Sequence, residues 1–231
     1  PALPTAAAAE QLPTPTVEWV TGNKTIGDRT FRNGQVVLTD IPASLPNYRV
    51  EIINEDTQEV FETYEDGFGG TKWDLQEIWV GWYTDEVMPS GNYTASVTYL
   101  GDDGVTYTDS AAGTTQTYHY VAPGASYAVP TDVKWDGANF SYTVEDAAQN
   151  QSLFIEFAKV EEDGTYRSVG RRGDSVQYAQ ETNNDSFLER FNERVNRYGP
   201  GEYVFRIRVI SQDITAKWHS GWSAWSEPRY I

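Results

Sequence analysis

The sequence has no cysteine, and it has only one methionine and two histidines among its 231 residues. Without cysteine, the chain can form neither disulfides nor thiolate metal sites. His119 and His219 have no further ligating or catalytic residues at a plausible spacing, so a zinc site or a catalytic triad has no support. We therefore expect no metal, no cofactor and no enzymatic activity.

Long apolar runs are also missing, so we expect no direct insertion of this chain into a membrane. Positive charge is scarce: 17 Lys and Arg stand against 34 Asp and Glu, giving a net charge of −17. Nucleic-acid phosphates would be repelled by such a chain, which excludes nucleic acid as a partner.

Aromatic residues are abundant, at 14% of the chain, with 15 Tyr and 8 Trp. Tyr and Trp, with Thr and Val, suit the half-buried surface of a pleated sheet. The composition therefore favours an all-β fold.

The chain begins PALPTAAAAEQLPTPT, which is made of small residues and prolines without periodicity. Such a segment cannot bury a core, so residues 1–15 are expected to form a disordered N-terminal tether. Its position at the start of the chain suggests that a signal peptide or anchor segment was removed upstream. The expected location is extracellular or on the cell surface.

Two halves of the chain repeat each other. The matching pairs are TVEWV (16–20) with TDVKWDG (131–137), YRVEIINEDTQEVF (48–61) with LFIEFAKVEEDGTY (153–166), and SGNYTASVTYL (90–100) with PGEYVFRIRVI (200–210). The first pair predicts a Trp-bearing strand, the second a hairpin and the third a long alternating strand. The repeat predicts two domains, residues 16–122 and 129–231, joined by a linker over residues 123–128.

About seven short strands in roughly 100 residues predict an antiparallel β-sandwich for each domain. One stretch in each repeat breaks the strand pattern. DSFLERFNERV (185–195) has apolar residues at a helical spacing, and WDLQEIWVGWYTDEV (73–87) occupies the equivalent place. We expect a short helical turn before the penultimate strand of both sandwiches.

The Trp strand, the hairpin and the G-x-Y strand together resemble fibronectin type III-like repeats. The stretch GNYTASVTYLGDDGVTYTDS (91–110) is similar to Ig-like and fibronectin-like repeats on surface proteins of Gram-positive gut bacteria. The resemblance covers nearly all of the chain after residue 15. It implies the fold and says little about a ligand.

The segment GWSAWSEP (221–228) resembles the WSxWS box of class I cytokine receptors, in which tryptophan rings interleave with arginines. In the strand YVFRIRV, alternation puts Arg206 and Arg208 on one outward face, where Trp222 and Trp225 could sandwich them. The receptor family has its second arginine two residues further along, where this chain has Ile210, and its first domain carries disulfides. We therefore predict a structural cation–π ladder and not a cytokine receptor.

The Gly-rich loop GFGG is followed by Trp73, Trp79 and Trp82. Trp79 and Trp82 are three residues apart and could share a helical face in the core. The alternative is that these tryptophans form an aromatic platform that binds a ligand such as a sugar ring.

The segment RRGDS (171–175) contains Arg172, Gly173 and Asp174, an Arg-Gly-Asp triplet of the integrin-binding type. We expect this triplet in an exposed turn. Gly-Asp is also ordinary turn chemistry, so the triplet alone does not establish integrin binding.

The functional hypothesis is a non-catalytic exported or cell-surface module that acts as a spacer or a protein-binding scaffold. The alternative hypothesis is a carbohydrate-binding module that uses the Trp-rich stretch of the first domain. The expected partner is an unidentified protein or glycan, and the chain is expected to be a monomer.

Overall fold

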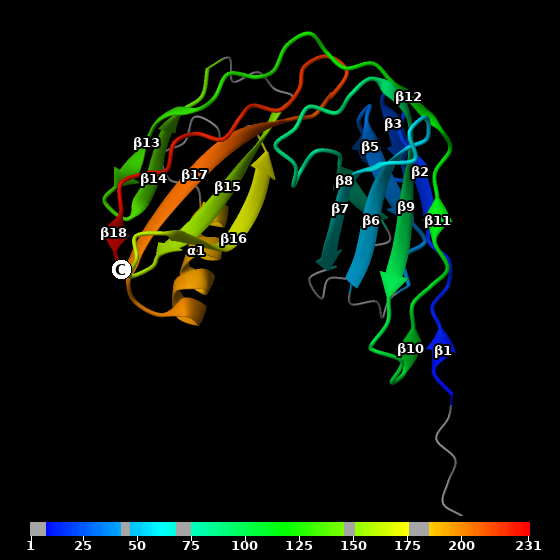
Figure 1. Ribbon diagram of the computed structural model, residues 1–231, viewed down its shortest axis with the longest axis horizontal. Coiled ribbons are helices and arrows are strands. Elements are labelled where there is room, and N and C mark those ends of the chain that lie inside the picture. Colours follow the sequence, from blue (N-terminus) through cyan, green and yellow to red (C-terminus); the bar gives the residue numbers. More distant parts are fainter. Residues whose placement is uncertain (1–7, 43–46, 68–74, 146–150, 176–184) are drawn as a thin grey trace, which may run out of the picture. The chain divides into compact units, whose positions relative to one another are not determined.

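A computed structural model describes residues 8–42, 47–67, 75–145, 151–175 and 185–231. The chain divides into two compact units, Pro1–Ala122 (unit 1) and Pro123–Ile231 (unit 2). The described residues form β-sheets, antiparallel except for one two-stranded parallel pair, with one helix (Figure 1), which confirms the all-β prediction. No helix in these ranges is long and apolar enough to cross a bilayer.

Unit 1 is built from two main sheets, ordered β2-β5-β8 and β11-β9-β6-β7, and β12 also pairs with β9. Its strands are β1 (Glu10–Gln11), β2 (Thr16–Trp19), β3 (Lys24–Ile26), β4 (Arg29–Phe31), β5 (Gln35–Thr39), β6 (Asn47–Asn54), β7 (Val60–Gly67), β8 (Leu75–Trp79), β9 (Gly91–Leu100), β10 (Tyr107–Thr108), β11 (Gly113–Thr114) and β12 (Tyr118–Tyr120). The predicted hairpin over residues 48–61 is the β6–β7 pair.

Aromatic rings join the two sheets of unit 1. Trp19 of β2 is buried and stacks on Tyr118 of β12, with ring centroids 4.8 Å apart and planes 5° apart. Within one sheet, Tyr120 of β12 also meets Tyr93 of the paired strand β9 edge to face at 6.2 Å. Two antiparallel sheets facing each other in this strand order form a fibronectin type III-like β-sandwich.

Unit 2 has a sheet ordered β16-β15-β17-β18 and a second sheet of β13 and β14. Its elements are β13 (Thr131–Asp136), β14 (Asn139–Thr143), β15 (Gln151–Val160), β16 (Tyr166–Ser175), α1 (Asp185–Tyr198), β17 (Glu202–Ser211) and β18 (Arg229–Tyr230). Phe140 of β14 contacts Phe205 of β17 and Phe157 of β15, with ring centroids 4.8 and 5.6 Å apart. These buried rings form the core between the two sheets.

The helical turns were predicted equally for both units, and the units differ. In unit 2, α1 is a 14-residue helix that buries Phe187 and Phe191 in the core beside β16 (Figure 1). In unit 1 the prediction for residues 73–87 is wrong, because Leu75–Trp79 is strand β8 and pairs with β5. Backbone pairing with β5 satisfies this segment, so it extends instead of coiling.

Parts of the predicted N-terminal tether and of the predicted linker make hydrogen bonds to the rest of their units. Residues 10–11 pair in parallel with β10 and Leu12 is buried, so the disordered tether predicted over residues 1–15 is wrong at its C-terminal end. In the segment 123–128, Tyr127 donates its backbone N–H to the carbonyl of Trp218 at 3.0 Å. Backbone pairing therefore fixes parts of both segments that composition alone suggested were free.

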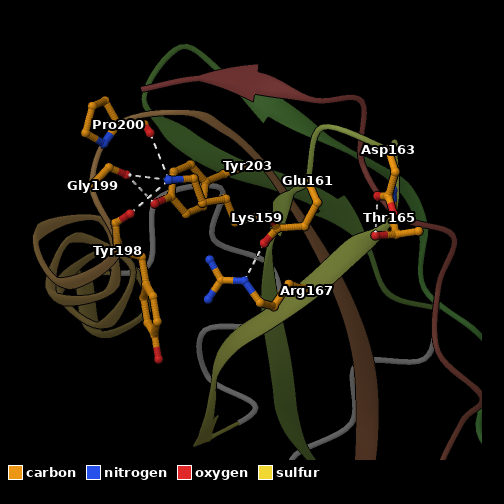
Figure 2. Close-up of polar contacts among 9 residues, drawn as sticks. All are labelled: Lys159, Glu161, Asp163, Thr165, Arg167, Tyr198, Gly199, Pro200 and Tyr203. Carbon is orange, nitrogen blue, oxygen red and sulfur yellow. Dashed lines mark hydrogen bonds and ion pairs between the residues drawn. The ribbon is translucent and has the colours of Figure 1, made fainter.

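The C-terminal end of α1 is held by a lysine from the sheet (Figure 2). Lys159 Nζ donates to the carbonyls of Tyr198 at 2.8 Å, Pro200 at 2.9 Å and Gly199 at 3.4 Å. The last carbonyls of a helix lack intrahelical donors, and a cation there also favours the helix dipole. Gly199 adopts a φ of 77°, the left-handed conformation that ends many helices.

Replacing Lys159 with methionine is expected to lower the free energy of unfolding of unit 2 by about 2 kcal/mol, because three helix-end carbonyls lose a charged donor. Urea denaturation followed by circular dichroism at the helix band measures this change. The control is Lys134→Met on β13, an exposed position with an expected change below about 0.5 kcal/mol. Equal stability of the two variants would contradict the capping role.

Candidate functional site

Strand β17 presents the predicted arginines on the face opposite the core. Tyr203, Phe205 and Ile207 are buried on the inner side, as alternation predicts. Arg206 is partly exposed, but Arg208 is only 2% exposed. Arg208 points away from the core as expected, but aromatic side chains lie over it and bury it.

The structure brings all four residues of the predicted ladder together. The Arg206 guanidinium carbon lies 4.6 Å from the ring centroids of both Trp222 and Trp225. The Arg208 guanidinium carbon lies 4.8 Å from the Trp222 centroid. Each arginine thus meets an indole within cation–π distance, and Arg206 contacts two indoles.

Two further rings extend the ladder, and sequence reasoning missed both. Phe154 of β15 lies 5.5 Å from the Arg208 guanidinium and 5.7 Å from the Trp222 ring. Tyr166 of β16 meets the Trp225 ring edge to face at 5.4 Å. Phe154 is the register partner of Arg208, so strand pairing is the signal that would have found it.

A buried carboxylate, Glu156, holds Arg206 of the ladder together with the neighbouring Arg171. Glu156 of β15 is 2% exposed and is the register partner of Arg206 and of Arg171. Its Oε2 accepts from Arg206 Nε at 2.8 Å, and its Oε1 accepts from Arg171 Nη2 at 3.1 Å and from Ser168 Oγ at 2.7 Å. Burial raises the pKa of Glu156, but these hydrogen bonds and the two positive charges outweigh burial and lower it. The carboxylate therefore stays ionised at neutral pH and holds Arg206 in place.

The serines around the tryptophans replace a strand partner for β17. Ser223 and Ser226 accept the backbone N–H groups of Ile207 and Phe205 at their Oγ atoms, at 3.0 and 3.1 Å. Ser220 does the same for Val209 at 2.8 Å. The spacing of three between the serines matches the spacing of two along the strand.

Each of these serines also makes backbone contacts. Their N–H groups donate to the carbonyls of Val209, Ile207 and Phe205, and their hydroxyls donate to the carbonyl of the following residue. The segment therefore runs along the edge of β17 without being a regular strand, and a strand forms only after it, at Arg229–Tyr230. His219 completes the edge by accepting the N–H of Ser211 at Nδ1, at 2.8 Å.

The Trp-rich stretch of unit 1 does not form a helical face. Trp73 lies outside the described residues. Trp79 is the last residue of β8, and Trp82 lies in the following turn, where its N–H donates to the carbonyl of Trp79 at 3.2 Å. Both rings are half-buried, so they are neither a closed core pair nor a fully exposed pair.

Next to this stretch is a hollow of about 410 Å³. It is lined by Phe61, Glu62, Thr63, Tyr83, Thr84, Asp85 and Glu86. Glu62 is buried, and its two oxygens accept the N–H groups of Gly81 at 2.7 Å and Tyr83 at 2.9 Å. The hollow combines a tyrosine ring with carboxylates. The ring can stack on the apolar face of a ligand, and the carboxylates can accept hydrogen bonds from its hydroxyl groups. Sequence reasoning did not find it, because β7 and the turn after β8 are joined only in the fold.

The Arg-Gly-Asp triplet lies in a strand, so the predicted exposed turn is wrong. Arg172, Gly173 and Asp174 belong to β16 and pair in register with Ile155, Phe154 and Leu153. The Nε of Arg172 donates to Ser186 Oγ of α1 at 3.2 Å. Ladder pairing therefore holds the triplet extended along β15.

Comparison with known proteins identifies no family. No protein-family model and no curated protein matches the sequence. A solved structure of the FN1–FN3 domains of chicken CNTN1 is similar at 13% identity, over 97% of this chain and 68% of that chain, with a TM-score of 0.29. A TM-score this low supports no further inference, so the fold assignment rests on the sheets and strand order described above.

Proposed function

We propose that this chain is a non-catalytic module of an exported or cell-surface protein, where it acts as a spacer or a protein-binding scaffold. The observation that supports this most is the cross-braced sheet of unit 2. Ser220, Ser223 and Ser226 hold the edge of β17. The indoles of Trp222 and Trp225 enclose Arg206, which the buried Glu156 also holds.

A braced edge suits a module that must stay folded and monomeric outside the cell. An open strand edge pairs readily with other chains, and covering it prevents such pairing. The end of the chain is also fixed, because Ile231 and Gly201 exchange two backbone hydrogen bonds, at 3.0 and 3.2 Å. A module held in this way can act as a spacer, or can present other surfaces to a partner, without changing its own structure.

The location is tested by brief trypsin treatment of intact cells of the source organism. We expect peptides of residues 1–231 to be released before lysis, with a cytoplasmic marker protein retained. Recovery of these peptides only after lysis would contradict an exported or cell-surface module.

Carbohydrate binding by unit 1 is the second candidate, and the hollow beside Tyr83 is the observation that favours it. Tyr83 is 36% exposed at the rim, with Asp85 and Glu86 next to it. A sugar ring could stack on the phenol while its hydroxyls donate to the carboxylates. Trp79 and Trp82 would then support the turn or extend the contact.

A glycan array with fluorescence titration of any hit separates the two candidates. The scaffold proposal expects no specific glycan. Binding that is lost in Tyr83→Ala, Trp79→Ala or Trp82→Ala, and is kept in the control Tyr230→Ala at a 72% exposed position, would favour sugar recognition instead. Thermal unfolding of each variant shows that a lost signal is not lost folding.

A further inference from the structure

Arginine is concentrated on one side of unit 2, although the chain as a whole is strongly acidic. Nine of the twelve arginines lie in residues 123–231. Six of these are on β16 and α1: Arg167, Arg171, Arg172, Arg190, Arg194 and Arg197. The net charge of −17 makes this local excess of positive charge an exception that needs a physical reason.

Three of the six arginines already have specific contacts. Arg167 forms an ion pair with Glu161 and lies 5.1 Å from the ring centroid of Tyr198. Arg171 forms an ion pair with the buried Glu156. The Arg197 guanidinium carbon also lies over the Tyr198 ring, 5.6 Å from its centroid. These contacts account for Arg167, Arg171 and Arg197.

The other three, Arg172, Arg190 and Arg194, lie on α1 and on the strand β16 that it packs against. The stem of Arg194 lies across the backbone of Gly170, where a Cβ atom would be 2.8 Å from its Nε. Arg172 reaches α1 from β16 through its hydrogen bond to Ser186. Arg190 donates from Nη1 to Glu193 Oε2 at 2.9 Å. The small residue at 170 therefore leaves room for the Arg194 side chain against β16.

The charges of all three guanidinium groups act on the Glu193 carboxylate. The hydrogen bond from Arg190 lowers the pKa of the Glu193 carboxyl, and the positive charges of Arg190, Arg194 and Arg172 lower it further. Among the described residues, these three positive charges and the one negative charge of Glu193 leave a local excess of two positive charges. Burial and the charge of Arg190 lower the pKa of the Arg194 guanidinium, so this excess carries an electrostatic penalty.

Donor groups at this place are also unsatisfied. The Nε–H groups of Arg190 and Arg194 are buried, and neither has a hydrogen-bond acceptor among the described residues. Packing therefore holds the Arg190 and Arg194 side chains in place. A preorganised, under-neutralised group of guanidiniums is the arrangement that binds an oxyanion by several charge-assisted hydrogen bonds.

We propose that Arg172, Arg190 and Arg194 form a binding site for a small tetrahedral oxyanion, a sulfate or phosphate group. Such a group carries enough oxygens for three guanidiniums and the negative charge that the cluster lacks. An extended polyanion fits less well, because the rest of the chain is acidic and would repel it. The proposal is independent of the scaffold function, since none of the three arginines belongs to the ladder or lines the hollow.

The test is isothermal titration calorimetry of the whole chain with sodium sulfate and sodium phosphate, in sodium chloride at constant ionic strength. We expect saturable binding of at least one anion, and Kd values about tenfold higher in Arg194→Gln and in Arg172→Gln, since each loses one guanidinium. Arg172 is exposed, so its variant retains the fold if Arg194→Gln does not. The matched control is Arg49→Gln, an exposed arginine of unit 1, which keeps the wild-type Kd.

A second arm identifies the source of the anion. Glucosamine 6-sulfate and glucose 6-phosphate are titrated beside the free ions, and a lower Kd for a sugar ester than for its free ion assigns a site for an esterified group. Equal or tighter binding of the free ion assigns an inorganic anion. Absence of saturable binding, or the same Kd in the wild type, Arg194→Gln and Arg172→Gln, overturns the proposal.

Discussion

Replacing Trp222 with alanine is expected to lower the free energy of unfolding of unit 2 by about 3 kcal/mol, the scale for removing a large aromatic ring with its cation–π contacts. Trp222 is central in the ladder, because its ring contacts Arg206, Arg208 and Phe154. Its loss opens the cover over the buried Arg208. Urea denaturation monitored by the remaining tryptophan fluorescence measures the change.

The matched variant is Trp225→Ala at the outer end of the same ladder. Trp225 contacts Arg206 and Tyr166 and covers no buried arginine, so a loss about half as large is expected. Trp82→Ala in unit 1 controls for the loss of an indole elsewhere. If Trp222→Ala unfolded like the wild type but no longer bound a partner, the indole would be a ligand site and the structural interpretation would be wrong.

The ladder shows how far alternation along one strand can predict a site. A period of two put Arg206 and Arg208 on the same face, and the WSAWS segment supplied two indoles. The burial of Arg208 was not predictable, because it depends on Phe154, which strand pairing places opposite it. The same holds for Glu156, since register between strands is set by the whole sheet.

The helix prediction is correct for one of two segments with similar apolar patterns and wrong for the other. Both have apolar residues three or four apart, and short apolar segments of this kind are ambiguous between helix and strand. Residues 75–79 have a partner in β5, whose hydrogen bonds favour an extended chain. In unit 2 the corresponding place holds α1, whose Phe187 and Phe191 fill the core directly. Tertiary context therefore decided between two structures that local pattern allowed.

The serine spacing explains why the segment along the edge of β17 is not a regular strand. The structural repeat along this segment is three residues long, whereas the repeat of a strand is two. Hydroxyl groups of Ser220, Ser223 and Ser226 accept strand N–H groups that a regular partner strand would bind through its carbonyls. Side-chain acceptors that replace backbone pairing leave no signature in a hydrophobic pattern.

Glu156→Gln is expected to lower the free energy of unfolding of unit 2 by about 2–3 kcal/mol at pH 7, because Arg206 and Arg171 lose the charge that neutralises them. The size of this effect depends on pH. The pKa of Glu156 is lower in the folded state than its usual value of 4.5. The folded state therefore binds this proton less tightly than the unfolded state does, and the stabilisation is fully present above about pH 4.5.

As the pH falls from about 4.5 through the lowered pKa, the wild type loses this contribution and the neutral glutamine variant does not. The difference in unfolding free energy between the two proteins should therefore shrink steadily on acidification, even though other carboxylates destabilise both. Urea denaturation at pH 7, 5, 4 and 3 gives this difference directly. Glu162→Gln in the exposed hairpin turn is the control and should match the wild type at every pH. A Glu156→Gln difference that stayed constant from pH 7 to 3 would mean that carboxylate shape, and not its charge, holds Arg206 between the indoles.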